Sequence, residues 1–377
     1  MTKTVAIIGQ GLTGITAGLM LAQHRYGHKN GERHDILLIG AKPRLIGGLQ
    51  LAPNGLEALR AIGLYDAALD SGVRLDNIVI TAMSDGRALA EIPHPKNRIY
   101  IGIGRSDLYQ AIEAKLGRQK NVERIESPAL SITRANDKME LVLEDGQTLY
   151  VDEIIGADGV NGLCRSFVCG AQLTAKAAPY YAMRCDIEAN VLPRLFSRAQ
   201  TQLILGDGCH FVSYPMAGQR RINMVFCASS EQLGPEWQAQ LLAPHPILKY
   251  VADASPHWVK LPLFSNGLPA SWRRMHVTLI GDAAHIMPPH LAQGAGQSFV
   301  DIAYLKAQLQ EEALSDALRS MAIMRASQLK STTSKASLTG QVMRLSGLPG
   351  QLRDSLLGLS GTHLLENWLA DVWHAKH

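Results

Sequence analysis

The chain of 377 residues is 46% hydrophobic and 19% charged, with a formal net charge of +4. This composition is typical of a globular protein with a sizeable core. The mild positive excess would attract carboxylate substrates or NADPH rather than nucleic acid. We interpret the cationic stretch from Arg319 to Lys335 as a solvated helix face. No apolar run approaches the roughly 18 residues that span a bilayer, which excludes a transmembrane helix.

The five cysteines are odd in number, form no C-x-x-C pair and show no metal-ligand spacing. Free or buried thiols in a reducing cytosol are the simplest interpretation, so we expect a cytoplasmic protein without a metal site. The first apolar run contains a glycine motif and is not interpreted as a signal sequence. The cysteines are Cys164, Cys169, Cys185, Cys209 and Cys227.

A G-x-G-x-x-G turn lies near the N-terminus. Thr4–Ile8 is a short β-type run, Gly9, Gly11 and Gly14 follow it, and Ile15–Gln23 has a helical pattern. This strand–turn–helix context indicates a site for a dinucleotide pyrophosphate, which the helix N-terminus would face. A plain glycine turn is the alternative.

The second predicted strand, Ile36–Ile39, departs from the usual dinucleotide pattern. An acid at the end of this strand normally binds the adenosine ribose, whereas here the strand ends at Gly40 and Asp35 precedes it. The connection before the strand, Tyr26–His34, is also long. We therefore expect weak retention of the dinucleotide, and we expect Gly40→Glu to tighten binding.

Two further turns follow along the chain. Ser106 opens a predicted capped helix that runs to Gly117, and Arg105 directly precedes it. The string IIGADG then places Asp158 and Gly159 after another apolar run. A strand that ends at an acid and a glycine is the second sign of a nucleotide-binding edge.

Residues 178–265 change character, because several β runs follow one another. This pattern indicates an antiparallel sheet inserted into an α/β scaffold. His210 and Tyr214 lie four positions apart on one run, so the imidazole and the phenol share a face. A core histidine beside a core tyrosine is the alternative. The runs are Tyr180–Ile187, Gln200–Leu205, His210–Tyr214 and Arg221–Cys227.

The most informative stretch is 281–296, GDAAHIMPPHLAQGAG. Its Asp282 follows the buried-strand pattern Val277–Ile280, and a carboxylate there can accept hydrogen bonds from a polyol. The N–H groups of Gly294–Gly296 open a helical pattern and favour an adjacent anion. His290, in the proline-rich turn, is a candidate to face a substrate.

The C-terminal part is predicted to be mostly helical from Gln297 to Leu345. The glycines and the proline of residues 346–361 predict a looser segment, followed by helical Leu364–Trp373.

The three turns, in this order and spacing, resemble the group A FAD-dependent aromatic monooxygenases, which share the fold of p-hydroxybenzoate hydroxylase. The family strings are GxGxxG, GADG with a following Arg, here Arg165, and GDAAH-x3-P-x2-GQG, here with Pro289 and AQG. The family's Ser after GADG is replaced by Gly162. The string 206–215, GDGCHFVSYP, is similar to the salicylate and 3-hydroxybenzoate hydroxylase branch.

The resemblance implies an α/β fold with a Rossmann-like FAD-binding domain, an interwoven antiparallel β-sheet substrate domain and C-terminal helices. We expect the FAD-binding domain to be discontinuous. The expected segments are 1–80, 100–177 and 266–310 for FAD binding, 81–99 and 178–265 for the substrate sheet, and 311–377 for the helices.

The resemblance also assigns residue roles. Asp282 would bind the ribityl chain of FAD, Asp158 would lie near the pyrophosphate, and Arg105 would contact the flavin side. His210, with a pKa near neutrality, would remove the phenolic proton of a substrate that Tyr214 also contacts. The implied cofactor set is Gly9, Gly11, Gly14, Arg105, Asp158, Gly159, Gly281, Asp282, Gly294 and Ala295, and the catalytic set is His210, Tyr214 and His290.

The implied reaction is hydroxylation of a phenolic or N-heteroaromatic substrate, expected to bear a carboxylate, with O2 and either NADH or NADPH. Reduced flavin would form a C4a-hydroperoxide that transfers one oxygen atom to the ring. NAD(P)H would bind only transiently. We expect a monomer or homodimer whose partners are a small aromatic substrate and O2, with no nucleic acid or membrane.

Two alternatives stay open. Another flavoprotein class on the same scaffold, such as a halogenase or a prenyl-chain reductase, would share the cofactor strings, although the halogenase string W-x-W-x-I-P is absent. A non-enzymatic member with a degraded, weak FAD site would explain Gly40, whereas the intact 281–296 string argues against it. The absorption spectrum of the purified protein distinguishes these cases.

Overall fold

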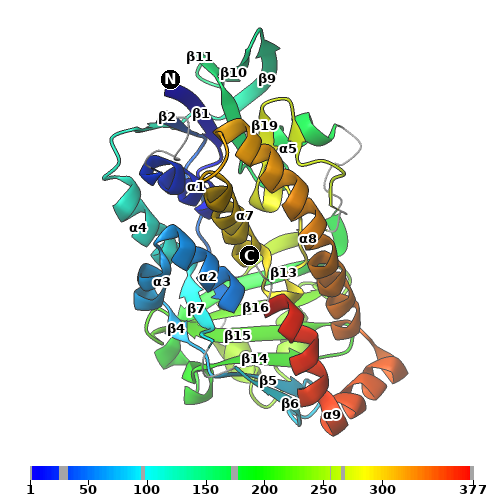
Figure 1. The fold of residues 1–377 in the computed structure, drawn as a ribbon. Helices are drawn as coiled ribbons and strands as arrows, with labels where there is room; N and C mark the ends of the chain where they lie inside the picture. The colour runs from blue at the N-terminus through cyan, green and yellow to red at the C-terminus, as the bar shows by residue number, and fades with distance from the viewer. Residues whose placement is uncertain are drawn as a thin grey trace.

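A computed structural model of the chain shows two large β-sheets with helices packed against them (Figure 1). The structure describes residues 2–24, 33–94, 98–170, 177–254, 256–264 and 268–373. Within these ranges, no helix is both long enough and apolar enough to cross a membrane. The predicted α/β fold with an inserted sheet and C-terminal helices is confirmed.

The first sheet has six strands, all parallel except the β18–β19 pair. In spatial order they are β18 (Arg273–Arg274), β19 (Val277–Leu279), β12 (Glu153–Gly156), β1 (Thr2–Ile8), β2 (Arg33–Ile39) and β8 (Val122–Ile125). The side chains of Val5, Ile7 and Ile155 are completely buried, as expected for central parallel strands covered on both faces. Helix α1 (Leu12–Gln23) follows β1 through the predicted glycine turn.

The second sheet has seven strands and contains all the predicted β runs of residues 178–265. In spatial order they are β17 (Val259–Phe264), β13 (Ala177–Glu188), β16 (Arg221–Ser229), β15 (His210–Met216), β14 (Gln200–Leu205), β5 (Asn77–Ala82) and β6 (Ala88–Pro93). The sheet is antiparallel except between β14 and β5. That parallel pair arises because β5 belongs to an earlier chain segment and is not joined to β14 by a hairpin.

Shorter elements complete the scaffold. Helix α4 begins at Arg105 with Gly104 as its N-cap, one residue before the predicted start, and residues 144–147 form a turn between two antiparallel strands. The two small sheets are β3 (Gly48–Leu51), β7 (Ile101–Gly104) and β4 (Val73–Arg74), and β11 (Thr148–Val151), β10 (Lys138–Leu143) and β9 (Ala129–Ala135). The short helices are α2 (Pro53–Ile62), α3 (Tyr65–Ser71), α4 (Arg105–Leu116), α5 (Leu163–Cys169) and α6 (Lys249–Asp253).

Three helices form the C-terminal part: α7 (Gly294–Gln308), α8 (Leu314–Met343) and α9 (Gly347–Trp373). The expectation of a looser segment at 346–361 was wrong, because α9 is continuous there. Helix α9 packs along β6 (Figure 1), and a Cβ at Gly361 would lie 3.0 Å from the Cβ of Ala90. Tertiary packing therefore offsets the entropic cost of glycine in this helix.

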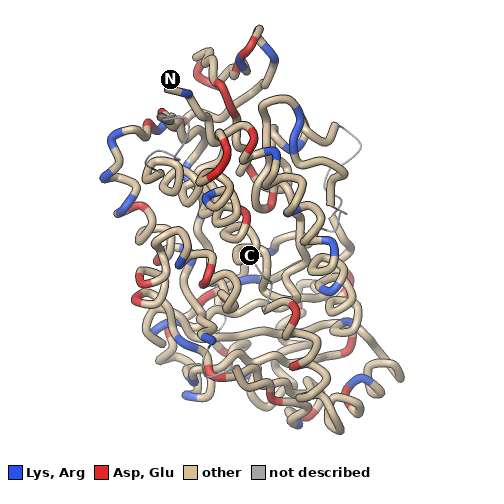
Figure 2. Tube along the Cα trace, in the orientation of Figure 1, with Lys and Arg blue, Asp and Glu red and all other residues tan. Residues whose placement is uncertain are grey.

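The interpretation of Arg319–Lys335 as a solvated face was also wrong at one residue. Basic and acidic residues are interspersed in Figure 2, but Arg325 is only 3% exposed and donates from Nε to Asp301 at 2.9 Å. Asp301 is fully buried; it also accepts from the N–H of Gly281 at 3.0 Å and lies 2.7 Å from Nε2 of His285. This carboxylate joins α7 and α8 to the turn that follows β19.

We expect Asp301→Ala to lower the free energy of unfolding by about 3–5 kcal/mol, because it leaves the buried Arg325 without its counter-charge. Urea unfolding followed by circular dichroism measures this change. Asp316→Ala is the matched control, since Asp316 pairs with exposed Arg319 at 3.0 Å and should cost at most about 1 kcal/mol. Equal losses in the two variants would contradict the role of Asp301.

Candidate active site

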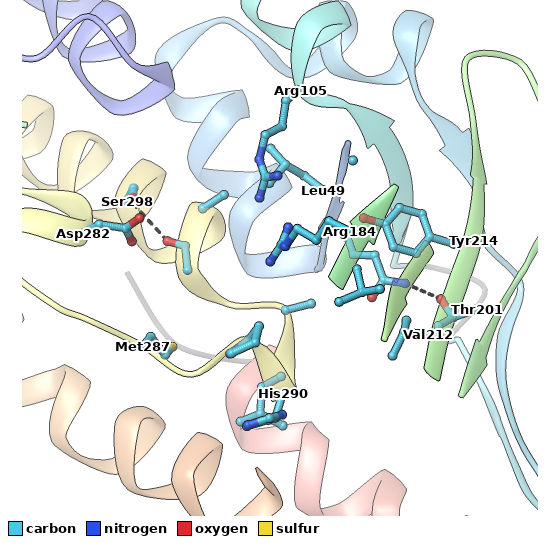
Figure 3. Close-up of a pocket in the computed structure, with 18 of the residues that line it drawn as sticks. Leu49, Arg105, Arg184, Thr201, Val212, Tyr214, Asp282, Met287, His290 and Ser298 are labelled. Atoms are coloured by element: carbon cyan, nitrogen blue, oxygen red, sulfur yellow. Dashed lines mark hydrogen bonds between the residues drawn. The ribbon is translucent and has the colours of Figure 1, made fainter. Parts of the chain in front are cut away.

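A cavity of about 640 Å³ is lined by the turns that follow strands of the six-stranded sheet, by the seven-stranded sheet and by helices that include α7, α8 and α9. This volume lies within the usual range of ligand pockets. In Figure 3, Asp282 and Ser298 lie at one end, Thr201 and Val212 lie at the other, and Arg105 and Arg184 lie between them. The predicted site residues that line the cavity are Gly9, Gly11, Arg105, Asp158, Gly159, His210, Tyr214, Asp282, His290, Gly294 and Ala295.

Two predicted cofactor residues, Gly14 and Gly281, do not line the cavity. A Cβ at Gly14 would lie 1.8 Å from the carbonyl oxygen of Gly9, so the glycine allows α1 to pack against the turn. Gly281 donates its N–H to Asp301 and thereby fixes the backbone before Asp282. Both glycines therefore support the site through backbone packing, without contacting the cavity.

The dinucleotide end of the cavity has open backbone around the start of α1. A Cβ at Gly11 or Gly159 would meet no atom within 4 Å, so the chain leaves room for a ligand against its backbone. The first N–H groups of α1 have no intrahelical acceptor and face this space. The geometry fits a pyrophosphate.

Asp282 occupies the strand-end position that the sequence predicts. Its side chain lies at the cavity beside the first residues of α7, Gly294 and Ala295. The hydroxyl of Ser298 donates to the Gly294 carbonyl at 3.0 Å, which orders this first turn. A carboxylate beside helix N–H groups can bind a polyol and an anion together.

Asp158 lines the cavity and also supports a helix. Its carboxylate accepts the N–H of Cys164 at 2.8 Å, in the first turn of α5. A Cβ at Gly162 would lie 2.1 Å from the Asp158 carboxyl carbon, so Gly162 leaves the space that Asp158 needs. Asp158 thus satisfies an N–H of the first turn of α5, where the N-cap residue Gly162 has no side chain, and burial raises the pKa of this carboxyl.

Arg105 and Arg184 form a cationic pair inside the cavity (Figure 3). Arg105 donates to the carbonyl of Ile46 at 2.7 Å; burial, and then the Arg184 charge, lower the pKa of Arg105 to about 10. Nε of Arg184 is buried without a hydrogen-bond partner in the described part of the chain. Two adjacent guanidinium groups favour an anionic ligand between them.

His210 and Tyr214 share the cavity-facing side of β15, as predicted. The His210 and His290 ring centroids lie 5.4 Å apart, and Nε2 of His290 lies 3.0 Å from an Arg344 nitrogen. Burial lowers the pKa of His210 well below its usual value, lowers that of His290 to about 4, and raises that of Tyr214 to about 12. The expectation of a near-neutral pKa at His210 was therefore wrong, because its surroundings are apolar and its charged neighbours are cationic.

The backbone conformation explains why residue 40 is a glycine, and the sequence alone does not reveal this conformation. Its φ is +126°, a conformation in which a side chain is strained. The Gly40 carbonyl accepts a 2.6 Å hydrogen bond from Gln10. A glutamate here would be strained, so we now expect Gly40→Glu to destabilise the protein instead of tightening cofactor binding. Most of the long connection Tyr26–His34 lies outside the described residues.

Sequence reasoning missed two parts of the site. Arg184 follows an ordinary β pattern, and only its cross-strand position next to Val225 brings it to the cavity. Trp368 and Trp373 of α9 also line the cavity; their segment was predicted to be helical, but no local pattern indicated that it packs against the site. The described residues contain no cluster of three or more His, Cys, Asp or Glu side chains that could hold a metal ion.

Comparison with known proteins places this fold and site in a family. Residues 2–321 match the family described as "FAD binding domain", so the chain belongs to that family and its cofactor is FAD. The chain is 28% identical over 331 residues to 3-hydroxybenzoate 6-hydroxylase 1 of Aquipseudomonas alcaligenes, covering 83% of this chain and 82% of that protein. It is 27% identical over 315 residues to 3-amino-4-hydroxybenzoate 2-monooxygenase of Streptomyces cremeus, covering 80% and 77%.

Solved structures share the fold. Klebsiella pneumoniae HpxO, complexed with FAD and uric acid, superposes with a TM-score of 0.85 at 18% identity, covering 98% of this chain and 96% of that chain. A salicylate hydroxylase substrate complex superposes with a TM-score of 0.80 at 19% identity, covering 100% and 96%. The predicted resemblance to flavoprotein aromatic hydroxylases is confirmed.

We expect Asp282→Ala to leave the fold intact and to strip the flavin. Loss of a charged hydrogen-bonding group should weaken FAD binding by about 1.5–3 kcal/mol. Flavin absorbance per protein, measured beside circular dichroism, gives the result. Asp137→Ala, in the turn between β9 and β10, is the control. Full flavin occupancy in Asp282→Ala would exclude the assigned role.

We expect Gly40→Glu to destabilise the protein by about 1–3 kcal/mol because of the positive φ, without tighter FAD binding. Ala41→Glu adds the same charge one position later, at an exposed residue, and should leave the Tm within about 2 °C. Thermal unfolding and titration of the apo protein with FAD test both variants. A stable Gly40→Glu protein with tighter FAD binding would restore the simpler sequence-based expectation.

Proposed function

We propose that the protein is an FAD-dependent monooxygenase that hydroxylates a phenolic or N-heteroaromatic substrate with NADH or NADPH and O2. The observation that carries this proposal is one continuous cavity. It combines an FAD-type end at Asp282 and α7 with a ring-sized space beside His210, Tyr214 and two arginines. The named relatives that hydroxylate substituted benzoates support the same reaction class.

The residues present fit FAD. The start of α1 and the open backbone at Gly11 and Gly159 would hold the pyrophosphate, and Asp282 with the first turn of α7 would hold the polyol and the ring edge. When bound, FAD supplies the oxygen-activating chemistry. The protein supplies position, charge and exclusion of water.

Activation of the substrate ring is the chain's own task. A phenol placed between Arg105 and Arg184 is favoured as its phenolate, because a unit charge roughly 5 Å away is worth about 3 kcal/mol at an effective dielectric of 20. His210, whose pKa is lowered by burial, is neutral and lines the cavity, so its imidazole can accept a hydrogen bond from the phenol. The resulting electron-rich ring is the better nucleophile.

The predicted roles of Tyr214 and His290 complete the proposal. The Tyr214 phenol, whose pKa of about 12 keeps it protonated, would donate to the substrate oxygen. His290, which is neutral beside Arg344, would form one wall of the space that holds the substrate ring. We also propose a cytoplasmic location, a monomer or homodimer, and the domain division expected from the sequence.

The test is the absorption spectrum of the purified protein, followed by a search for aromatic carboxylates and pyridinols that accelerate NAD(P)H oxidation. A hydroxylated product, identified by mass spectrometry, supports the proposal. A protein that binds no flavin, or a flavoprotein that hydroxylates no aromatic compound in such a screen, contradicts it.

We expect His210→Ala to lower turnover of a competent substrate about 10²–10⁴-fold, with FAD occupancy unchanged. Because the pKa of His210 lies well below its usual value, kcat/KM should not fall between pH 8 and pH 6.5 through this residue. The control is His363→Ala, an exposed histidine on the outer side of α9. Normal turnover in His210→Ala would show that the arginine pair alone activates the ring.

A further inference from the structure

The part of the cavity farthest from Asp282 has a floor made by the seven-stranded sheet. One transverse row of residues crosses five hydrogen-bonded strands in register, from β13 through β16, β15 and β14 to β5. All five side chains line the cavity. In order they are Arg184, Val225, Val212, Leu203 and Ile80. The floor therefore changes from cationic at one edge to aliphatic at the other.

The opposite wall of this region is also apolar. Helix α9 contributes Leu365, Trp368, Leu369 and Trp373, all of which line the cavity. Leu369 and Trp373 pack in one hydrophobic cluster with Leu203 and Ile80. We call this region, enclosed by β14, β5 and α9, the distal chamber.

The hydroxyl groups at the distal chamber and the indole of Trp368 already have partners. Thr201 Oγ1 accepts from the Gln50 amide at 2.7 Å, and the Tyr100 hydroxyl donates to the same amide's oxygen at 3.2 Å. Thr339 accepts from the Trp368 indole at 3.0 Å. A charged group placed here would lose its hydration without gaining a counter-ion.

The charged side chains that line the cavity lie elsewhere. They are Arg44, Arg105, Asp158, Arg184 and Asp282, and none comes from β14, β5 or α9. A ligand is thus sorted by polarity along one axis, with anionic groups toward Arg184 and apolar groups toward Ile80.

We propose that the substrate is an aromatic ring that carries an apolar substituent, an alkyl chain or a second ring, and that this substituent fills the distal chamber. The inference rests on the proposed function, because it places the reacting ring beside His210 and Arg184. A bare hydroxybenzoate would leave the distal chamber unfilled.

Binding is the direct test, with FAD-loaded protein and no NAD(P)H. The probes are salicylate, 4- and 5-propylsalicylate, and the matching 4- and 5-(2-carboxyethyl)salicylates, whose side chains have similar length but end in a charge. Flavin absorbance changes and quenching of tryptophan fluorescence give Kd. At least one propyl isomer should bind about ten- to fiftyfold more tightly than salicylate, whereas its carboxyethyl counterpart should bind no better than salicylate.

Variants locate the effect. Leu203→Phe fills the distal chamber from the floor and should reduce the propyl preference to less than about threefold, and Leu369→Phe should do the same from α9. Leu359→Phe is the matched control, since Leu359 is 85% exposed on the outer side of α9 and should keep the full preference. Circular dichroism confirms that each variant is folded.

Two results would overturn the proposal: equal Kd values for salicylate and both propyl isomers, or no binding by either propyl isomer. Loss of the preference in Leu359→Phe as well would exclude the distal chamber as its cause. Failure of the proposed function is seen separately. A propyl preference in binding without any hydroxylated product would refute monooxygenase activity while leaving the distal chamber assigned.

Discussion

The structure depends most on one buried carboxylate. Asp301 lies in the core, where an isolated charge would cost several kcal/mol, and it is compensated by Arg325, by His285 and by the N–H of Gly281. These partners come from α8 and from the turn after β19. Because all three must be in place for the charge to be tolerated, the turn cannot shift without breaking the network. Asp282 directly follows Gly281, so the hydrogen bond from the Gly281 N–H to Asp301 also fixes the position of Asp282 at the FAD-type end of the cavity.

The C-terminal helices α8 and α9 explain why the two sheets can share one cavity. Helix α8 runs from the Asp301 network to the seven-stranded sheet (Figure 1), and its last turns contribute Thr339 and Met343 to the lining. Helix α9 then packs along β6 and encloses the far side. The FAD-type end and the substrate-ring end of the cavity are thus connected through packed helices. The distance between these two ends is therefore set by side-chain packing and not by a flexible linker.

Local patterns were sufficient for the strand–turn–helix motifs and for the β runs, because glycine spacing and period-two alternation are properties of neighbouring residues. They failed where the determinant is distant in sequence. Arg325 is buried only because Asp301 faces it, and α9 is helical because β6 supports its glycines. Asp158 combines a predictable and an unpredictable feature. Its place at a strand end was predictable, whereas its hydrogen bond to the N–H of Cys164 depends on the absence of a side chain at Gly162.

The burial of the ring site redistributes its chemistry. A histidine in apolar surroundings near other cations holds a proton poorly, which weakens it as a base. The same low dielectric strengthens the field of Arg105 and Arg184 on any oxygen between them. In the proposed reaction the positive charges of Arg105 and Arg184 therefore supply most of the stabilisation of the phenolate. His210 accepts the hydrogen bond from the phenol and so orients its proton. The cationic edge of the sheet then does more than select a carboxylate: it sets which end of a substrate can react, while the aliphatic edge determines what the other end must be.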